Sequence, residues 1–236
     1  MTVVTVSGQI GTGARDIGRL VAERLGIDYV DQEILVEAAR ELGVPVESVV
    51  THDERTAGLG ERLANMLRRF LESSAAAGAA DPMLGSGGLD IVLGRTYTEA
   101  AAEESQQEVS GDQYIDTLSR IIRDLAGHDN VVILGRGSQV ILQDRPGTLH
   151  VLLVSPLPAR IAYIATRDSI DVEAAAKRLH DAAHGRADFH SKFFKVHVDD
   201  PSLYHLTLNT GRLSQDQVAQ LICEVAHRVA PSSDRA

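Results

Sequence analysis

A short β-branched run that leads straight into a glycine-rich turn and an amphipathic helix constrains this chain more than any other feature. The run covers residues 3–6, and the turn carries Gly8, Gly11 and Gly13. Glycines let several backbone N–H groups point toward one centre, and the N-terminus of the following helix adds a positive dipole. This order predicts a cradle for phosphate groups at the end of a buried strand.

The turn departs from the common phosphate-binding pattern at one place. The P-loop pattern G-x-x-x-x-G-K-[ST] fits Gly8 and Gly13, but Ala14 and Arg15 stand where Lys and Ser or Thr are expected. A charge-assisted hydrogen bond contributes roughly 1.5–3 kcal/mol. Losing the lysine without replacement would therefore weaken nucleotide binding on the order of 10–100-fold. Arg15 supplies a replacement charge, although it projects about 100° further around the helix than residue 14.

Composition excludes several classes of function. The 236-residue chain carries 23 basic and 33 acidic side chains, which gives a formal net charge of −10. Because phosphate backbones are bound by basic faces, a nucleic-acid polymer is not expected as a partner. No apolar run approaches the roughly 20 residues of a membrane span, and the single cysteine, Cys223, fits a reducing compartment. These features predict a cytoplasmic protein that binds neither nucleic acid nor membrane.

Strand and helix patterns alternate along the chain. This alternation predicts an α/β fold with a parallel sheet covered by helices on both faces. A capping box, Ser214-x-x-Gln217, opens the last helix. Strands are predicted at residues 3–6, 28–30, 131–134, 149–154 and 204–208, and helices at 17–25, 32–42, 46–50, 59–70, 115–125, 157–167, 172–182 and 214–229.

Several predicted strands end in residues suited to ligand binding. In a parallel sheet the ligand site lies beyond the carboxyl ends of the strands. Asp31 follows one strand, while Arg136 and Arg212 each stand beside glycine after two others. A guanidinium fork can grip a phosphate at such a turn. Any single turn of this kind is also compatible with a purely structural role.

Four segments, residues 11–18, 29–34, 132–137 and 199–210, together carry a resemblance. With them the chain resembles the cytidylate kinase-like family of P-loop proteins, relatives of the nucleoside monophosphate kinases. The resemblance implies a P-loop NTPase-type sheet in a single domain over residues 1–236. It further implies a helical or loop insert at 55–112, as an acceptor-binding or dimer region, and a lid-like segment at 167–198.

The resemblance also implies an activity, namely transfer of the γ-phosphoryl group of ATP to CMP or dCMP with Mg²⁺. Its partners would be nucleotides, and a homodimer is compatible with it. Catalysis would fall to Arg15, Arg178 and Arg186, and acceptor binding to Asp31 and Arg136. ATP would be bound by Gly8, Gly11, Thr12, Gly13, Ala14, Arg15 and Arg212, whereas the ligands of the metal are not identified.

Three departures from the family pattern keep other functions open. Leu134 and Ala183 stand where acidic residues are expected, and Arg15 replaces the hydroxyl residue that usually meets Mg²⁺. One alternative is a nucleotide-binding regulatory protein without transfer activity. Another is a kinase of a different small metabolite.

Overall fold

The computed structural model of the protein describes residues 2–31, 111–128 and 130–229. A parallel sheet of five strands lies at its centre, in the order β2-β3-β1-β4-β5. The most N-terminal strand is therefore the middle one, and the glycine-rich turn opens at the middle of the sheet's carboxyl edge. The strands are β1 (Val3–Gly8), β2 (Asp28–Val30), β3 (Val131–Leu134), β4 (Thr148–Val154) and β5 (Leu206–Asn209).

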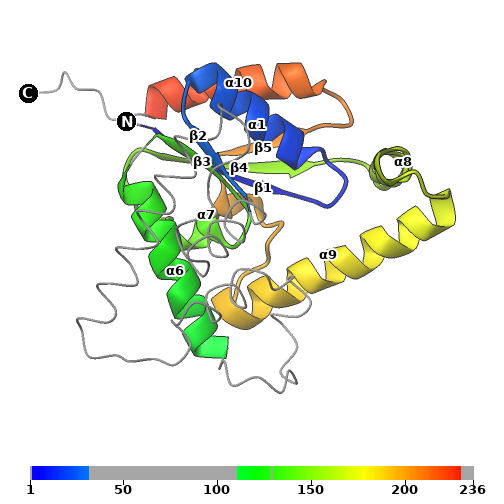
Figure 1. The fold of residues 1–236 in the computed structure, drawn as a ribbon, viewed down its shortest axis with the longest axis horizontal. Helices are drawn as coiled ribbons and strands as arrows, with labels where there is room; N and C mark the ends of the chain where they lie inside the picture. The colour runs from blue at the N-terminus through cyan, green and yellow to red at the C-terminus, as the bar shows by residue number, and fades with distance from the viewer. Residues whose placement is uncertain (1, 32–110, 129, 230–236) are drawn as a thin grey trace, which may run out of the picture.

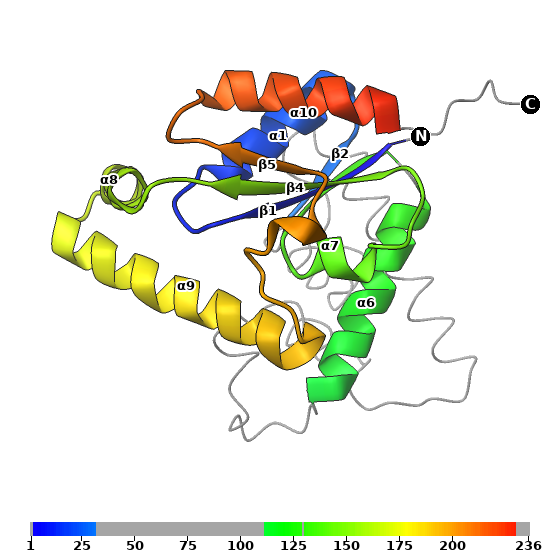
Figure 2. The ribbon, with the colours of Figure 1, turned by 180° about the vertical axis from the view of Figure 1, so that it is seen from behind.

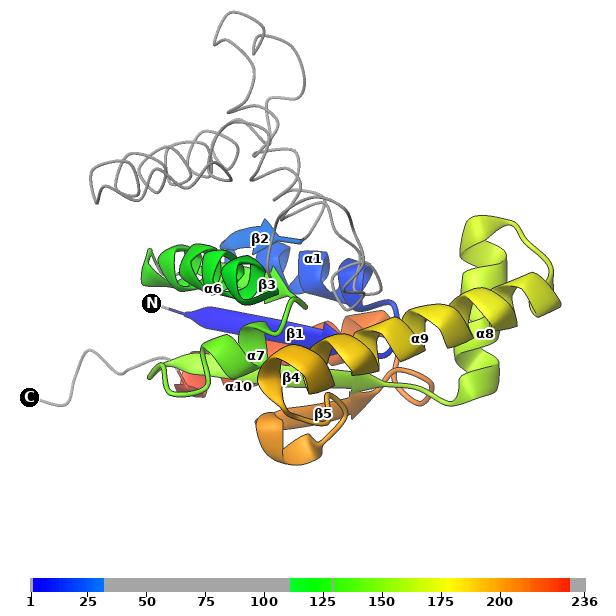
Figure 3. The same ribbon diagram turned by 90° about the horizontal axis from the view of Figure 1, so that it is seen from below.

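Helices cover both faces of the sheet (Figures 1 and 2). One face carries α1 (Ala14–Leu25) and α10 (Gln215–Val229), and the other carries α6 (Gly111–Gly127), α7 (Ser138–Ile141) and α9 (Val172–Phe194). The remaining helix, α8 (Leu157–Asp168), lies to one side, beyond the carboxyl end of β4 (Figure 3). This arrangement confirms the predicted α/β fold of P-loop NTPase type.

The two faces of β1 differ in polarity because successive strand side chains point to opposite sides. Val4 and Val6 are fully buried in the apolar core formed with α1 and α10. On the opposite side Thr5 and Ser7 are also buried. Thr5 Oγ1 lies 2.7 Å from His150 Nδ1, a buried hydrogen bond between neighbouring strands. A polar layer therefore runs beneath the strand that leads into the glycine-rich turn.

Most elements predicted within the described residues are present, but several boundaries differ and the short helix α7 was not predicted. The helix expected at 172–182 continues to Phe194 as α9, and its start is capped by Asp171, which accepts a 2.7 Å hydrogen bond from the Ala174 amide. The strand expected from residue 204 begins at Leu206, because a 3₁₀ turn, η3 (Pro201–Leu203), precedes it. Tyr204 belongs to that turn, since its amide donates to the Pro201 carbonyl.

Local signals at helix ends were reliable. Ser214 and Gln217 form the predicted capping box, with reciprocal hydrogen bonds of 2.9 and 3.2 Å. Gly26 ends α1 in the left-handed conformation, with a φ of 64°, as glycine commonly does after the last helical turn. The helices predicted at 32–42, 46–50 and 59–70 lie outside the described residues. So does the insert predicted at 55–112, apart from the start of α6. Among the described helices, none is long and apolar enough to cross a membrane.

Acid should destabilise the fold through two buried histidines. Burial lowers the pKa of His150 and of His190 to about 4. In the unfolded chain both titrate near 6.5. The unfolded state therefore binds more protons as the pH falls from about 6.5 to 4, and stability is lost over that window. At pH 5 the expected loss is about 2 kcal/mol for each histidine.

Urea denaturation at pH 7 and pH 5 measures this loss. His150→Gln, which cannot be protonated, should remove about half of the pH dependence, and His227→Gln, at an exposed position of α10, serves as the matched control. Equal stability of the unmodified protein at the two pH values would contradict the prediction.

Candidate functional site

The glycine-rich turn after β1 is closed by its own backbone. The Gln9 amide donates to the Leu153 carbonyl at 3.0 Å, and the Thr12 amide and hydroxyl donate to the Gln9 carbonyl at 3.1 and 2.8 Å. Within the described residues, the amides of Gly11, Gly13 and Ala14 meet no acceptor. They lie at the N-terminus of α1, so the turn leaves several donors available for an anion.

Two of the glycines are required by close packing. A Cβ atom on Gly8 would lie 2.6 Å from Ala14 Cβ and 2.7 Å from Thr12 Oγ1. Gly11 has a φ of 88° and lies against α8, where a Cβ would come within 2.8 Å of the Arg160 carbonyl oxygen. The turn therefore wraps tightly over Gly8 and is held against α8.

Arg15 joins the start of α1 to the end of β2. Its Nε lies 3.3 Å from Oδ2 of Asp31, whose side chain is only 2 % exposed. The Tyr29 hydroxyl donates to the same oxygen at 3.2 Å, and burial together with the Asp31 charge raises the pKa of Tyr29. Arg15 and Asp31, predicted to serve different substrates, are thus in direct contact.

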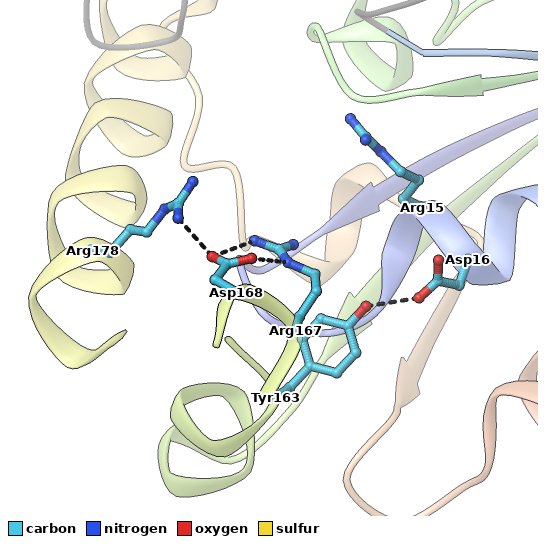
Figure 4. Close-up of a pocket in the computed structure, with 6 residues that line it drawn as sticks. All are labelled: Arg15, Asp16, Tyr163, Arg167, Asp168 and Arg178. Atoms are coloured by element: carbon cyan, nitrogen blue, oxygen red, sulfur yellow. Dashed lines mark hydrogen bonds and ion pairs between the residues drawn. The ribbon is translucent and has the colours of Figure 1, made fainter. Parts of the chain in front are cut away.

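A pocket of about 440 Å³ opens beside the start of α1, between α1 and the helices α8 and α9 (Figure 4). Arg167 and Arg178 both bind Asp168, at 2.6 and 2.7 Å. These bonds hold the pKa of Asp168 below its ordinary value. Three guanidinium groups and two carboxylates line the pocket, and the Asp31 carboxylate outside the lining is the ion-pair partner of Arg15. Its lining residues are Arg15, Asp16, Tyr163, Arg167, Asp168 and Arg178.

Arg186 lies elsewhere, beneath the turn rather than in the lining of this pocket. Its side chain is only 6 % exposed, and it donates to Asp199 Oδ1 at 2.7 Å and to Ser7 Oγ at 2.9 Å. The other oxygen of Asp199 accepts from Gln9 Nε2 at 2.9 Å. Burial raises the pKa of Asp199, but the bond and charge of Arg186 outweigh it, so that the pKa is lowered overall.

Arg136 and Arg212 occupy different surroundings. Arg136 is buried, with a φ of 57°, in the turn after β3. The Phe194 ring from the end of α9 packs against Gly137 in that turn and leaves no room for a Cβ there. Arg212 is exposed in the turn after β5, at the edge of the sheet. The structure thus places Arg136 next to the central strand and Arg212 two strands away from it.

The sequence of the chain matches a known family. A model of the cytidylate kinase-like family matches residues 3–212 of the chain.

The chain belongs to the cytidylate kinase-like family. It is 25 % identical to a cytidylate kinase of Methanopyrus kandleri, over 93 % of this chain and 90 % of the relative. It is 28 % identical to a cytidylate kinase of Natronomonas pharaonis, over 56 % of this chain and 69 % of the relative. Among solved structures, an uncharacterized protein from Eubacterium ventriosum is similar in fold, with a TM-score of 0.60 at 13 % identity. That match covers 96 % of this chain and 99 % of the other.

Sequence reasoning on this cytidylate kinase-like protein missed part of the pocket. It named Arg15 and Arg178 but not Asp16, Tyr163, Arg167 or Asp168. One signal was present, because Tyr163 and Arg167 stand four residues apart on one helix face and therefore point the same way. The Tyr163 hydroxyl reaches back to Asp16 Oδ2 at 2.7 Å, a contact between segments 147 residues apart.

Proposed function

We propose that this cytidylate kinase-like protein transfers the γ-phosphoryl group of ATP to a nucleoside monophosphate, with CMP or dCMP as the preferred acceptor. The observation that carries this proposal is the three-arginine pocket beside the unpaired amides of the glycine-rich turn. Phosphoryl transfer requires positioning and neutralisation of phosphate oxygens, which backbone amides and guanidiniums provide. The cytidylate kinases among its relatives support the choice of acceptor.

The donor phosphates would bind the turn over Gly8, Gly11, Thr12, Gly13 and Ala14, with Arg212 beside the adenine. Arg15 and Arg178 would face the transferring group from opposite sides of the pocket (Figure 4), with Arg186 below the turn. Arg136 and Asp31 would hold the acceptor, and residues 167–198 would act as a lid. A cytoplasmic location and a homodimer remain parts of this proposal.

The proposed transfer would use Mg²⁺, which would supply neutralisation of the charge on the phosphate groups. Asp16 fits as a ligand, because it lines the pocket and, among the described residues, only its Oδ2 accepts a hydrogen bond, from the Tyr163 hydroxyl. No group of three or more metal-ligating side chains occurs among the described residues.

A coupled assay tests the proposal directly. ATP, Mg²⁺ and each nucleoside monophosphate in turn are mixed with the protein, and ADP release is followed. We expect release above the ATPase background with CMP or dCMP. Release at background for every monophosphate would reject the proposed activity.

A second candidate is a nucleotide-binding regulator without transfer activity. Leu134 ends β3 and Ala183 lies within α9, so both positions lack the acid that the family pattern leads us to expect. Calorimetry distinguishes the two functions, because a regulator binds ATP tightly while the coupled assay stays at background.

Arg15 and Arg136 should affect different substrates. Arg15 lines the pocket beside the turn, so Arg15→Ala should weaken ATP binding by about 10-fold, the loss of one charge-assisted bond. Arg136 is buried in the turn after β3, so Arg136→Ala should mainly raise KM for the acceptor. Titration calorimetry with ATP and with CMP separates the effects, and Arg24→Ala, at the far end of α1, serves as control. Equal losses for both nucleotides in both variants would contradict this division.

A further inference from the structure

One carboxylate next to the glycine-rich turn is held by groups from two other segments. Asp199 lies between α9 and η3, and both of its oxygens are taken. Oδ1 accepts from Arg186 at 2.7 Å, and Oδ2 accepts from Gln9 Nε2 at 2.9 Å. Gln9 is itself a residue of the turn, and its Oε1 accepts from the Ser155 amide at 3.3 Å. The carboxylate therefore sits where the turn, the end of β4 and the middle of α9 meet.

A second arginine, Arg160 of α8, lies near this carboxylate without bonding to it. Burial has the largest effect on the pKa of Arg160 and lowers it. The positive charge of Arg186 also lowers this pKa, whereas the negative charge of Asp199 raises it, so the three side chains lie within electrostatic reach of one another. The backbone of Arg160 packs against Gly11 of the turn. Among the described residues, the Arg160 guanidinium makes no hydrogen bond or ion pair, and its Nε is buried.

The charges at this point do not balance. Arg186 is bonded to the single carboxylate, Arg160 lies near it without a bond, and within the described part of the chain the buried Nε of Arg160 has no partner. Buried charges and donors are costly unless they are paired. The excess charge is positive, and it lies next to the unpaired amides of the turn. A second anion would therefore balance this charge.

We propose that Arg160 and Arg186 form an anion subsite that takes a phosphate group of the substrate, and that Asp199 occupies this subsite when no substrate is bound. The inference rests on the proposed function in taking the anion to be a substrate phosphate. A phosphate offers the guanidinium forks the same paired oxygens as a carboxylate, with more charge. Asp199 is 38 % exposed, so it can turn toward solvent when phosphate replaces it.

Removing the charge of Asp199 should change anion binding in opposite directions under a purely structural role and under the proposed role. If Asp199 only fixes the turn by holding Gln9, then Asp199→Asn loosens the turn and weakens anion binding. If Asp199 competes with the substrate for Arg160 and Arg186, the same change removes a competitor and strengthens anion binding. The sign of the effect decides between the two roles.

Calorimetric titration of the full chain with pyrophosphate tests the subsite. We expect Asp199→Asn to bind pyrophosphate at least five times more tightly than the unmodified protein. Arg160→Met should bind it about ten times more weakly, as expected for the loss of a charge-assisted contact. Arg24→Met removes an arginine that pairs with Asp216 at the far end of α1 and should change the affinity less than twofold. Thermal melts confirm folding, and Arg160→Lys replaces Arg160→Met if the latter does not fold.

Weaker or unchanged binding by Asp199→Asn would overturn the subsite. Unchanged pyrophosphate binding by Arg160→Met or Arg160→Lys would also overturn the subsite. A lack of pyrophosphate binding by every variant would do the same. Because the probe carries no nucleoside and no turnover is measured, the result is independent of the coupled assay. If ADP release stays at background while Asp199→Asn binds pyrophosphate more tightly, the proposed kinase activity is rejected and the subsite is retained. If ADP release exceeds background while Asp199→Asn does not bind pyrophosphate more tightly, only the subsite is rejected.

Discussion

Replacing Gly8 with alanine should weaken ATP binding by at least about 100-fold, equivalent to about 2.7 kcal/mol. The new methyl group would lie 2.6 Å from Ala14 Cβ and 2.7 Å from Thr12 Oγ1, distances that folded proteins do not tolerate. The turn must open to relieve these contacts, and its amides then no longer converge. Overpacking of this kind costs roughly 1–3 kcal/mol of stability, which leaves the domain folded.

Titration calorimetry with ATP and Mg²⁺ measures this effect. Gly127→Ala is the matched control, because nothing lies within 4 Å of a Cβ at that position in α6 and its φ is not positive. The control should bind ATP like the unmodified protein. Undiminished affinity of the Gly8→Ala variant in a folded protein would show that the donor phosphates do not bind in this turn.

Replacing Arg186 with methionine should reduce kcat by about 1,000-fold, a loss of about 4 kcal/mol of transition-state stabilisation. Methionine keeps most of the buried aliphatic part of the side chain. It removes the positive charge that lies beside Ser7 and Asp199. The change also leaves the Asp199 carboxylate without its ion-pair partner. Stability should therefore fall as well, and the coupled assay and a urea titration measure the two effects separately.

A double variant separates the effects of Arg186 on activity and on stability. Asp199→Asn removes the carboxylate left unpaired by Arg186→Met, so the double variant should regain most of the lost stability. It should not regain activity, because the guanidinium is still missing. Recovery of turnover along with stability would mean that Arg186 acts only through the fold.

Elements with a strong local signal could be predicted from sequence. The apolar runs of β3 and β4 are buried on both faces, as central parallel strands require. The boundary of α9 could not be predicted in this way. The helix continues through Gly185, a residue that lowers helix propensity, because Phe189 and Arg186 beyond it are buried against the rest of the molecule.

The residues of the site could be predicted better than their contacts. Placement of Arg15, Asp31 and Arg136 at one edge follows from the rule that parallel strands end together. The bond between Arg186 and Ser7 joins positions 179 residues apart, so no local pattern announces it. Arg160 was missed for the same reason, since its surroundings come from the turn after β1 and from the segment around Asp199.

One helix links the two halves of the site. The 23 residues of α9 span about 35 Å at 1.5 Å per residue. Near its start Arg178 lines the pocket beside α1, and at its end Phe194 packs on the turn that holds Arg136. A straight helix behaves as a lever, so a tilt at one end displaces the other. If the proposed function holds, this lever would link donor and acceptor occupancy, and each substrate should alter the affinity of the protein for the other by the same factor.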